Sequence, residues 1–293
     1  MFNGVGTALI TPFDENFNVD YSALKKIVKF QVDNNVDAII VLGTTGEAPV
    51  INLDEREKII DTVVSEVKGR TKIIVGTGSN DTNKVVHLNK IAEKYKVDGL
   101  LIVNPYYNKG TQESIAAHYK YIEERTTLPI ILYNVPSRTG MNILPETVIK
   151  IIEQCPNVVG IKEASGNISQ IAHLFSLLPE SFKVFSGNDD QTFPIMALGG
   201  SGVISVFSNA FPNEKKMLTD ALLKGDLSTA RQLNNKYLNM MKLLFVEASP
   251  SPIKYIMSEL GYCKNVVRLP LIPVLEKSEK LLREELKNYI LKD

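Results

Sequence analysis

The chain has 293 residues, 44% of them hydrophobic and 23% charged, with a formal net charge of zero. This composition is ordinary for a globular protein with a sizeable core. The balanced charge excludes the basic footprint of a nucleic-acid partner, and no apolar run approaches the ~18 residues that span a bilayer. We therefore expect neither nucleic acid nor membrane as a partner.

The N-terminal segment, MFNGVGTALITPFDE, has no positively charged leader followed by an apolar stretch, so we expect no signal peptide. Cys155 and Cys263 are far apart and form no CxxC pair. Two isolated thiols are typical of a reducing compartment, and we expect a cytoplasmic protein without disulfides.

Short apolar runs alternate with longer amphipathic stretches along the chain. The stretches at 20–35, 52–69 and 113–126 have helical period. The apolar runs predict strands at 5–10, 37–43, 72–78, 99–104, 129–135, 158–164, 182–188 and 202–206.

Helix boundaries support this reading. Asp20, Asn52 and Asp81 stand where N-cap residues are expected, and Gly69 stands at a helix end. Continuous apolar strands linked by helices indicate a parallel sheet covered on both faces. Eight such units fit one (β/α)8 TIM barrel better than two Rossmann halves.

The last part of the chain, from about residue 213, has helical period with a break at 249–252. We read it as the last barrel helix followed by a small helical C-terminal extension. The expected division is a catalytic barrel at 1–224 and an extension at 225–293.

Active sites of such barrels lie at the carboxyl ends of the strands, where Lys162 is the most informative residue. Side chains alternate along a strand, so Lys162 enters the mouth if Ile161 packs under the helices. Desolvation lowers the pKa of a buried amine, and a neutral amine attacks ketones to form Schiff bases. The alternative is a lysine paired with a carboxylate.

Tyr133 ends the strand before the lysine strand, so the two ends should be neighbours. A phenol can shuttle protons for a carbinolamine if other hydroxyls relay them, and Thr44 and Tyr107 also follow strands. The alternative is that Tyr133 is a core aromatic residue.

The loop GTTGE, residues 43–47, has glycines that let backbone N–H groups approach an anion. Arg138, after the Pro136 turn, suits bidentate carboxylate recognition, with an ordinary surface charge as the alternative. The three histidines, His87, His118 and His173, lack metal-ligand spacing, and no nucleotide motif is present. We expect neither a metal nor a cofactor.

Five ordered motifs, GTTGE, YYN, YNVPSRTG, IKEASG and GGSGVISV, resemble those of the dihydrodipicolinate synthase family from Gly4 to about Leu269. That family is a class I aldolase-type lyase of (β/α)8 fold. The resemblance implies that the substrates are pyruvate and L-aspartate 4-semialdehyde, condensed in diaminopimelate and lysine biosynthesis.

Carried over to matching positions, the resemblance implies that Lys162 forms the Schiff base with pyruvate. Tyr133 would exchange protons through a relay of Thr44 and Tyr107. In the family this last tyrosine comes from a neighbouring subunit, which implies a homodimer that assembles to a homotetramer.

The resemblance also implies the substrate contacts. Thr45 would hold the pyruvate carboxylate, with the Ile204 backbone nearby, and Arg138 would bind the carboxylate of the semialdehyde.

Members of the family that lysine inhibits bind it at the dimer interface. Only two of those ligand positions match here, and the set in this chain is Asn80, Tyr106, Ala48, Leu53, Arg56 and Lys84. Lys84 replaces a glutamate and Arg56 a histidine, so we expect an enzyme that lysine does not inhibit.

Two rival readings remain open. A sister Schiff-base lyase, N-acetylneuraminate lyase or a 2-keto-3-deoxy sugar-acid aldolase, would share the lysine and tyrosine, but Arg138 better suits a short acidic aldehyde. A non-catalytic barrel that binds a 2-oxo acid would need no nucleophile.

Overall fold

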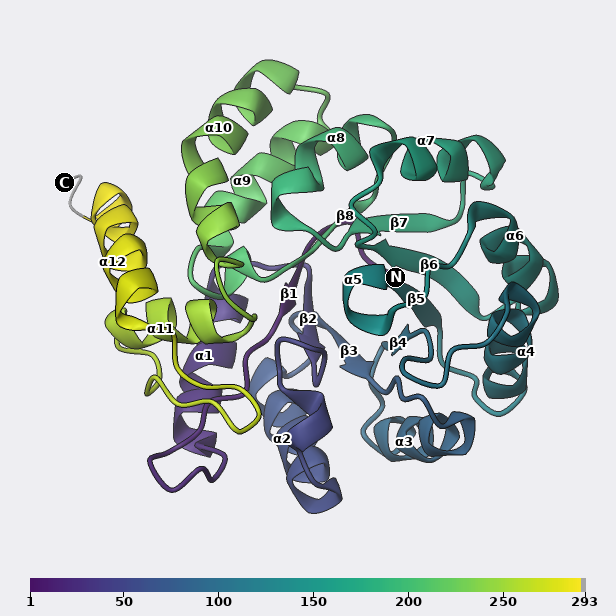
Figure 1. Cartoon of the computed structure of the whole chain (residues 1–293), viewed down its shortest axis with the longest axis horizontal. Coiled ribbons are helices and arrows are strands. Elements are labelled where there is room, and N and C mark those ends of the chain that lie inside the picture. Colours follow the sequence, from purple (N-terminus) through teal and green to yellow (C-terminus); the bar gives the residue numbers. More distant parts are fainter. Residues whose placement is uncertain (291–293) are drawn as a thin grey trace.

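The computed structural model describes residues 1–290, and its centre is a closed barrel of eight parallel strands (Figure 1). Each strand pairs with its neighbours in the sequence, and β8 closes onto β1, with Gly4 opposite Gly202 and Thr7 opposite Ser205. The strands are β1 (Gly4–Ala8), β2 (Ala38–Val41), β3 (Lys72–Gly76), β4 (Gly99–Val103), β5 (Ile130–Asn134), β6 (Val158–Glu163), β7 (Lys183–Ser186) and β8 (Gly202–Ser205).

The predicted (β/α)8 fold is confirmed, and each predicted apolar run overlaps one strand, although β1 begins one residue before its run. Every run extends one or two residues beyond the carboxyl end of its strand, and these residues begin the loops of the barrel mouth. The helices after the strands are α1 (Tyr21–Asp33), α2 (Leu53–Val67), α3 (Thr82–Lys94), α4 (Gln112–Glu123), α5 (Pro136–Thr139), α6 (Pro145–Gln154), α7 (Ile168–Leu177), α8 (Thr192–Ala197) and α9 (Pro212–Leu223), with 3-10 turns η1 (Ala48–Val50), η2 (Asp189–Gln191) and η3 (Phe207–Asn209).

The predicted N-caps are confirmed. Asp20, Asn52 and Asp81 each accept a backbone N–H of the first helical turn, and Asn52 forms a capping box with Glu55. The C-terminus of α2 differs by one residue, because Lys68 is the left-handed C-cap and Gly69 follows it, also at positive φ.

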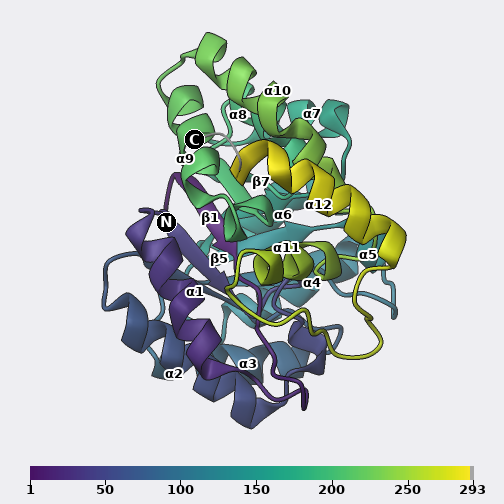
Figure 2. The same ribbon diagram turned by 90° about the vertical axis from the view of Figure 1, so that its left-hand side faces the viewer.

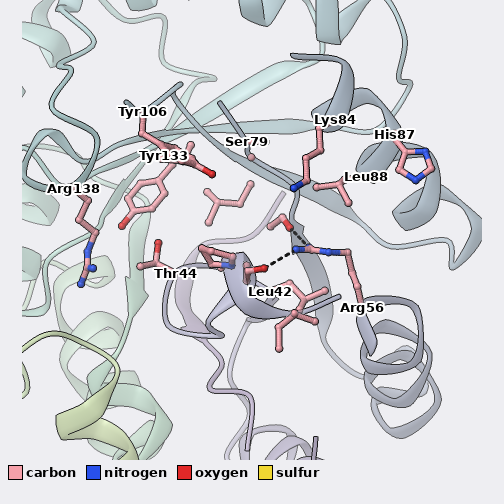
Figure 3. Close-up of a pocket in the computed structure, with 18 of the residues that line it drawn as sticks. Leu42, Thr44, Arg56, Ser79, Lys84, His87, Leu88, Tyr106, Tyr133 and Arg138 are labelled. Carbon is pink, nitrogen blue, oxygen red and sulfur yellow. Dashed lines mark hydrogen bonds between the residues drawn. The ribbon is translucent and has the colours of Figure 1, made fainter. Parts of the chain in front are cut away.

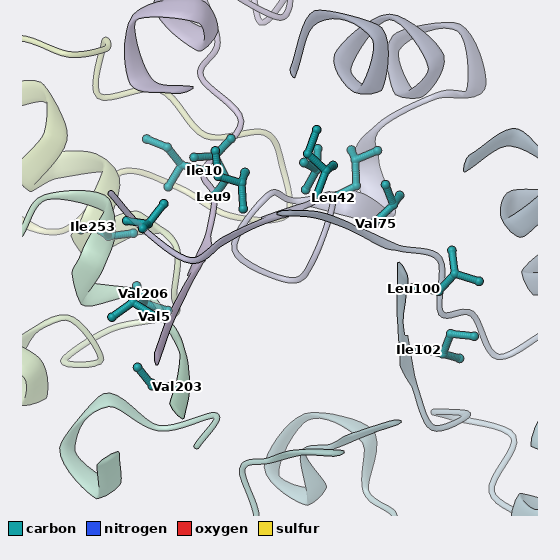
Figure 4. Close-up of a cluster of buried hydrophobic side chains, with 14 of the residues drawn as sticks. Val5, Leu9, Ile10, Leu42, Val75, Leu100, Ile102, Val203, Val206 and Ile253 are labelled. Carbon is teal, nitrogen blue, oxygen red and sulfur yellow. The ribbon is translucent and has the colours of Figure 1, made fainter. Parts of the chain in front are cut away.

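Two apolar cores follow from the alternation of side chains along the strands. The outer core lies between the sheet and the helices, and Figure 4 shows part of it, with Val5, Leu9 and Val203. The inner core fills the barrel with side chains such as Ile40 and Ile131. When a strand residue lies in the inner core, the residues before and after it in the strand therefore face the outer core, and the reverse also holds.

The C-terminal part consists of α10 (Leu227–Leu243), α11 (Ser251–Glu259) and α12 (Glu276–Ile290). Helix α10 packs on α9, and α12 packs on α10 and α11 (Figure 2). Ile253 of α11 belongs to the outer core, so the extension shares its packing with the barrel (Figure 4). The predicted break at 249–252 falls at the start of α11, and the division at residue 224 stays a prediction.

Candidate active site

Lys162 lies inside the barrel near the carboxyl end of β6. Its neighbours in register are Tyr133 on β5 and Phe185 on β7, both in the inner core, whereas Ile161 lies in the outer core. The side chain is 4% exposed, and its Nζ lies 4.4 Å from the centroid of the Tyr133 ring. The predicted inward direction of Lys162 is therefore confirmed.

The amine of Lys162 has no acid partner. Within residues 1–290, no carboxylate lies within 4.0 Å of its Nζ. Two other buried lysines are paired, Lys215 with Asp189 at 3.0 Å and Lys254 with Glu47 at 2.5 Å. The alternative of a carboxylate-paired Lys162 is thus wrong for the described part of the chain, and the amine is left for a ligand.

A glycine leaves room for this amine. A methyl group on Gly187, which follows β7, would lie 3.1 Å from Cε of Lys162 and 2.6 Å from Cβ of Ala164. Its backbone N–H donates to the Glu163 carbonyl at 2.7 Å, which joins the ends of β6 and β7. Glycine at this position therefore lets the lysine side chain extend past the neighbouring strand end.

A cavity of about 860 Å³ opens beside Tyr133. Thr44, Tyr133 and Arg138 lie along one side of it, and Arg56 and Lys84 lie on the other (Figure 3). The cavity thus brings together three of the predicted site residues, from the loop after β2, from β5 and from α5.

Thr44 and Thr45 belong to the loop between β2 and η1. Thr44 is half-buried at the cavity, and Thr45 is buried. The loop is closed by bonds from the Gly46 N–H to the Gly43 carbonyl and from the Glu47 N–H to the Thr44 carbonyl, both 3.1 Å. Gly46 is needed for close approach, because a Cβ there would lie 3.2 Å from the Leu9 carbonyl oxygen.

Arg138 stands on α5, a single helical turn between Pro136 and the left-handed Gly140, which explains the predicted turn. Arg138 is an exposed residue at the cavity, and its Nη2 donates to the Ser249 carbonyl at 3.4 Å. The guanidinium has no carboxylate partner within the described residues, which leaves it available to an anionic ligand.

The lining of this cavity does not include Lys162, Thr45 or Ile204, which are all buried. Tyr107 does not line the cavity either. It is 90% exposed, with a left-handed backbone at φ 71°, whereas Tyr106 lines the cavity. A proton relay from Tyr133 through Thr44 to Tyr107 is therefore incomplete within the described part of one chain.

Ile204 lies fully buried in β8, opposite Gly6 of β1. The carboxylate of Asp189 fixes the end of this strand by accepting bonds from the Ser205 hydroxyl at 2.6 Å and the Val206 N–H at 2.8 Å. The buried Lys215 compensates the charge of Asp189. This ion pair holds the backbone next to Ile204.

Sequence reasoning missed a buried polar network on the outer side of β6. Glu163 is 1% exposed and accepts bonds from the Asn134 amide at 3.0 Å and the Ser165 N–H at 2.6 Å. Burial raises the pKa of the Glu163 carboxyl, and these hydrogen bonds oppose that shift. The signal available in the sequence was a carboxylate inside an apolar strand, directly after the lysine.

Within residues 1–290, no group of three or more His, Cys, Asp or Glu side chains is arranged to hold a metal ion. The same residues include no helix that is long and apolar enough to cross a membrane.

An enclosed, unpaired lysine at the mouth of a (β/α)8 barrel defines the class of aldolase-type lyases. Residues 1–289 match the model of the dihydrodipicolinate synthetase family, and the chain belongs to that family.

The 4-hydroxy-tetrahydrodipicolinate synthase of Thermotoga neapolitana is 50% identical over 286 residues, which are 97% of each chain. The crystal structure of dihydrodipicolinate synthase from Thermotoga maritima is 48% identical, with a TM-score of 0.96 and 98% of both chains covered. That from Aquifex aeolicus is 45% identical, again with a TM-score of 0.96 and 98% of both chains covered.

We expect Gly187→Ala to stay folded but to lose about 10- to 100-fold in turnover number. Overpacking typically costs ~1–3 kcal/mol, and a displacement of ~1 Å at a reacting group costs up to ~100-fold in rate. Turnover measured beside a thermal melt followed by circular dichroism checks this. In the control Gly225→Ala, an added methyl meets no atom within 4 Å, but the backbone at φ 76° strains any side chain, so the melting temperature should fall while turnover stays unchanged. Full turnover in Gly187→Ala would show that Lys162 has more room than described.

Proposed function

We propose that the protein condenses pyruvate with L-aspartate 4-semialdehyde, which is the reaction of a 4-hydroxy-tetrahydrodipicolinate synthase in the diaminopimelate branch of lysine biosynthesis. The observation that carries this proposal is the enclosed Lys162 amine beside Tyr133, without an acid partner among residues 1–290, in a chain of this family. A barrel that only bound a 2-oxo acid would not need such a nucleophile.

The covalent steps follow from the amine. The neutral Nζ of Lys162 attacks C2 of pyruvate, and the carbinolamine loses water to give an iminium ion. Loss of a proton from the methyl carbon gives an enamine, whose carbon attacks the aldehyde of the semialdehyde. The amino group of that substrate then attacks C2, closes the ring and releases Lys162 as a free amine.

Tyr133 is proposed to carry the protons of these steps. Its ring contacts the Lys162 amine, and it shares the cavity with Thr44, whose hydroxyl passes protons onward. The exposed Tyr107 is proposed to complete the relay of a second copy of the chain. A large aromatic ring that is 90% exposed, on a residue with a left-handed backbone, supports this proposal of a homodimer. The doubling of this dimer to a homotetramer is proposed from membership of the family.

The substrate carboxylates are proposed to bind at two places. Thr45 and the backbone of Ile204 would hold the pyruvate carboxylate near Lys162. Arg138, at the cavity rim and without an acid partner in the described part of the chain, would bind the carboxylate of the semialdehyde. The chain is proposed to act in the cytoplasm, in keeping with two free cysteines.

A coupled assay with pyruvate and L-aspartate 4-semialdehyde tests the function. We expect turnover with this pair and none with N-acetylneuraminate or a 2-keto-3-deoxy sugar acid. Cleavage of either sugar acid without condensation would favour a sister lyase, and pyruvate binding without any turnover would favour a non-catalytic barrel.

Arg138→Ala should raise the KM for the semialdehyde at least tenfold and leave the KM for pyruvate within twofold. Loss of one partner of a charge-assisted pair that the bound substrate buries costs ~2–5 kcal/mol, or more than tenfold in affinity. Steady-state kinetics with each substrate varied in turn measures both constants. Arg125→Ala removes an exposed guanidinium of another surface loop and should change neither. Equal changes for both substrates would assign Arg138 a structural role.

Two inactive variants should complement each other if Tyr107 serves a neighbouring subunit. A mixed dimer of Tyr107→Phe and Lys162→Ala chains contains one site with Lys162, Tyr133 and an intact Tyr107 from the other chain. We expect activity to recover when the two chains are dissociated and then reassociated together. Half of the chains then form mixed dimers, and each mixed dimer has one working site of two, so activity should reach up to about one quarter of the wild-type value. A mixed dimer confirmed by native mass spectrometry but devoid of activity would contradict the shared tyrosine.

Millimolar L-lysine should not inhibit the enzyme at subsaturating pyruvate. Arg56 and Lys84 line the cavity, and although burial lowers the pKa of Arg56 to about 10, its guanidinium stays charged at neutral pH. Both cations repel the ammonium of a lysine ligand. Replacing an attracting carboxylate by a repelling cation costs at least ~2–5 kcal/mol of binding free energy. Initial rates with and without lysine, at constant ionic strength, decide the point. Clear partial inhibition would contradict it.

A further inference from the structure

The loop that presents Thr44 and Thr45 begins and ends with a left-handed residue that is not glycine. Leu42 has a φ of 58° and Glu47 a φ of 54°. Side chains with a Cβ rarely adopt this backbone, and it persists where the surrounding structure over-determines it. The contacts that hold Leu42 and Glu47 therefore set the positions of the two threonine hydroxyls between them.

Glu47 is held by the far end of the chain. Its side chain is 1% exposed, and its Oε1 lies 2.5 Å from Nζ of Lys254, an amine on α11 that is itself fully buried. Its Oε2 accepts the backbone N–H of Arg268 at 2.9 Å. Both carboxylate oxygens are thus engaged by the C-terminal extension, more than 200 residues away in sequence.

The groups that hold Glu47 are themselves fixed. Lys254 donates to the Val266 carbonyl at 2.8 Å, and its ammonium lies 3.9 Å from the centroid of the Phe13 ring. The Arg268 guanidinium also stacks on Phe13 and donates to Glu55, at the start of α2, at 2.8 Å. Glu55 follows the loop along the chain. Arg268 therefore holds the chain both at Glu47, where the loop ends, and at the start of α2.

We propose that Glu47 is a positioning residue for the pyruvate site, and that Lys254 and Arg268 hold it there. A buried carboxylate that lost its lysine would move toward water, because an unpaired buried charge is costly. Thr45 is only two residues away, so this movement would displace the hydroxyl proposed to hold the pyruvate carboxylate. The inference rests on the proposed function, and it makes the C-terminal extension part of the site without any contact to substrate.

Pyruvate binding in Lys254→Met tests this inference separately from the condensation. The readout is the pyruvate concentration that gives half-maximal borohydride-trapped adduct, measured by intact-protein mass. We expect it to rise at least tenfold, while the KM for the semialdehyde stays within twofold. The double variant Glu47→Gln/Lys254→Met should lie closer to wild type than Lys254→Met, because it no longer buries an unpaired carboxylate. A purely structural role would lower the melting temperature without this split between the substrates.

Two further variants keep the test decisive. Arg283→Gln breaks the 3.0 Å pair with Glu259 in the same extension, away from Glu47, and should leave the half-maximal concentration unchanged. If Lys254→Met does not fold, Glu47→Gln alone keeps the side-chain shape and should raise that concentration by a smaller factor. An unchanged concentration in a folded Lys254→Met or Glu47→Gln chain, or an equal effect on both substrates, would overturn the inference. A wild-type chain that forms no adduct would instead overturn the proposed function.

Discussion

The enclosure of one unpaired amine is the constraint on which the rest of the site depends. The alternation of side chains along β6 turns Lys162 into the barrel, and the absence of a side chain at Gly187 gives it room. Its amine lies over the Tyr133 ring, 4.4 Å from the ring centroid. A carboxylate in the same place would engage the amine in an ion pair, and the mouth would then lack its nucleophile.

The other two buried lysines within residues 1–290 show what pairing does instead. Lys215 neutralises Asp189, whose oxygens hold the end of β8. Lys254 neutralises Glu47, the last residue of the loop that carries Thr44 and Thr45. Each pair joins the mouth to a helix that follows the barrel strands in sequence. A buried pair adds little net stability, but it defines one geometry, and losing either partner is costly. These lysines position the site, whereas Lys162 supplies its chemistry.

Much of this architecture could be predicted from local sequence. Strand and helix periods are local properties, so the eight strands, the N-caps and the inward direction of Lys162 were all predictable. The C-cap at Lys68 could not be predicted, because a left-handed C-cap is expected at glycine and here a lysine adopts that backbone. The pairs Glu47–Lys254 and Asp189–Lys215 were also missed, because their members belong to different elements and only the tertiary fold brings them together. Tyr107 shows a different limit, since the site that it is proposed to serve lies in another copy of the chain.

The most direct test of the account is to locate the covalent bond. Wild-type protein treated with pyruvate and borohydride, digested and sequenced by mass spectrometry, should carry the reduced pyruvate adduct on Lys162 and on no other lysine. The Lys162→Ala chain, shown to be folded by circular dichroism, should carry none. An adduct on another lysine, or a wild-type chain that stays unmodified while it turns over both substrates, would contradict the account.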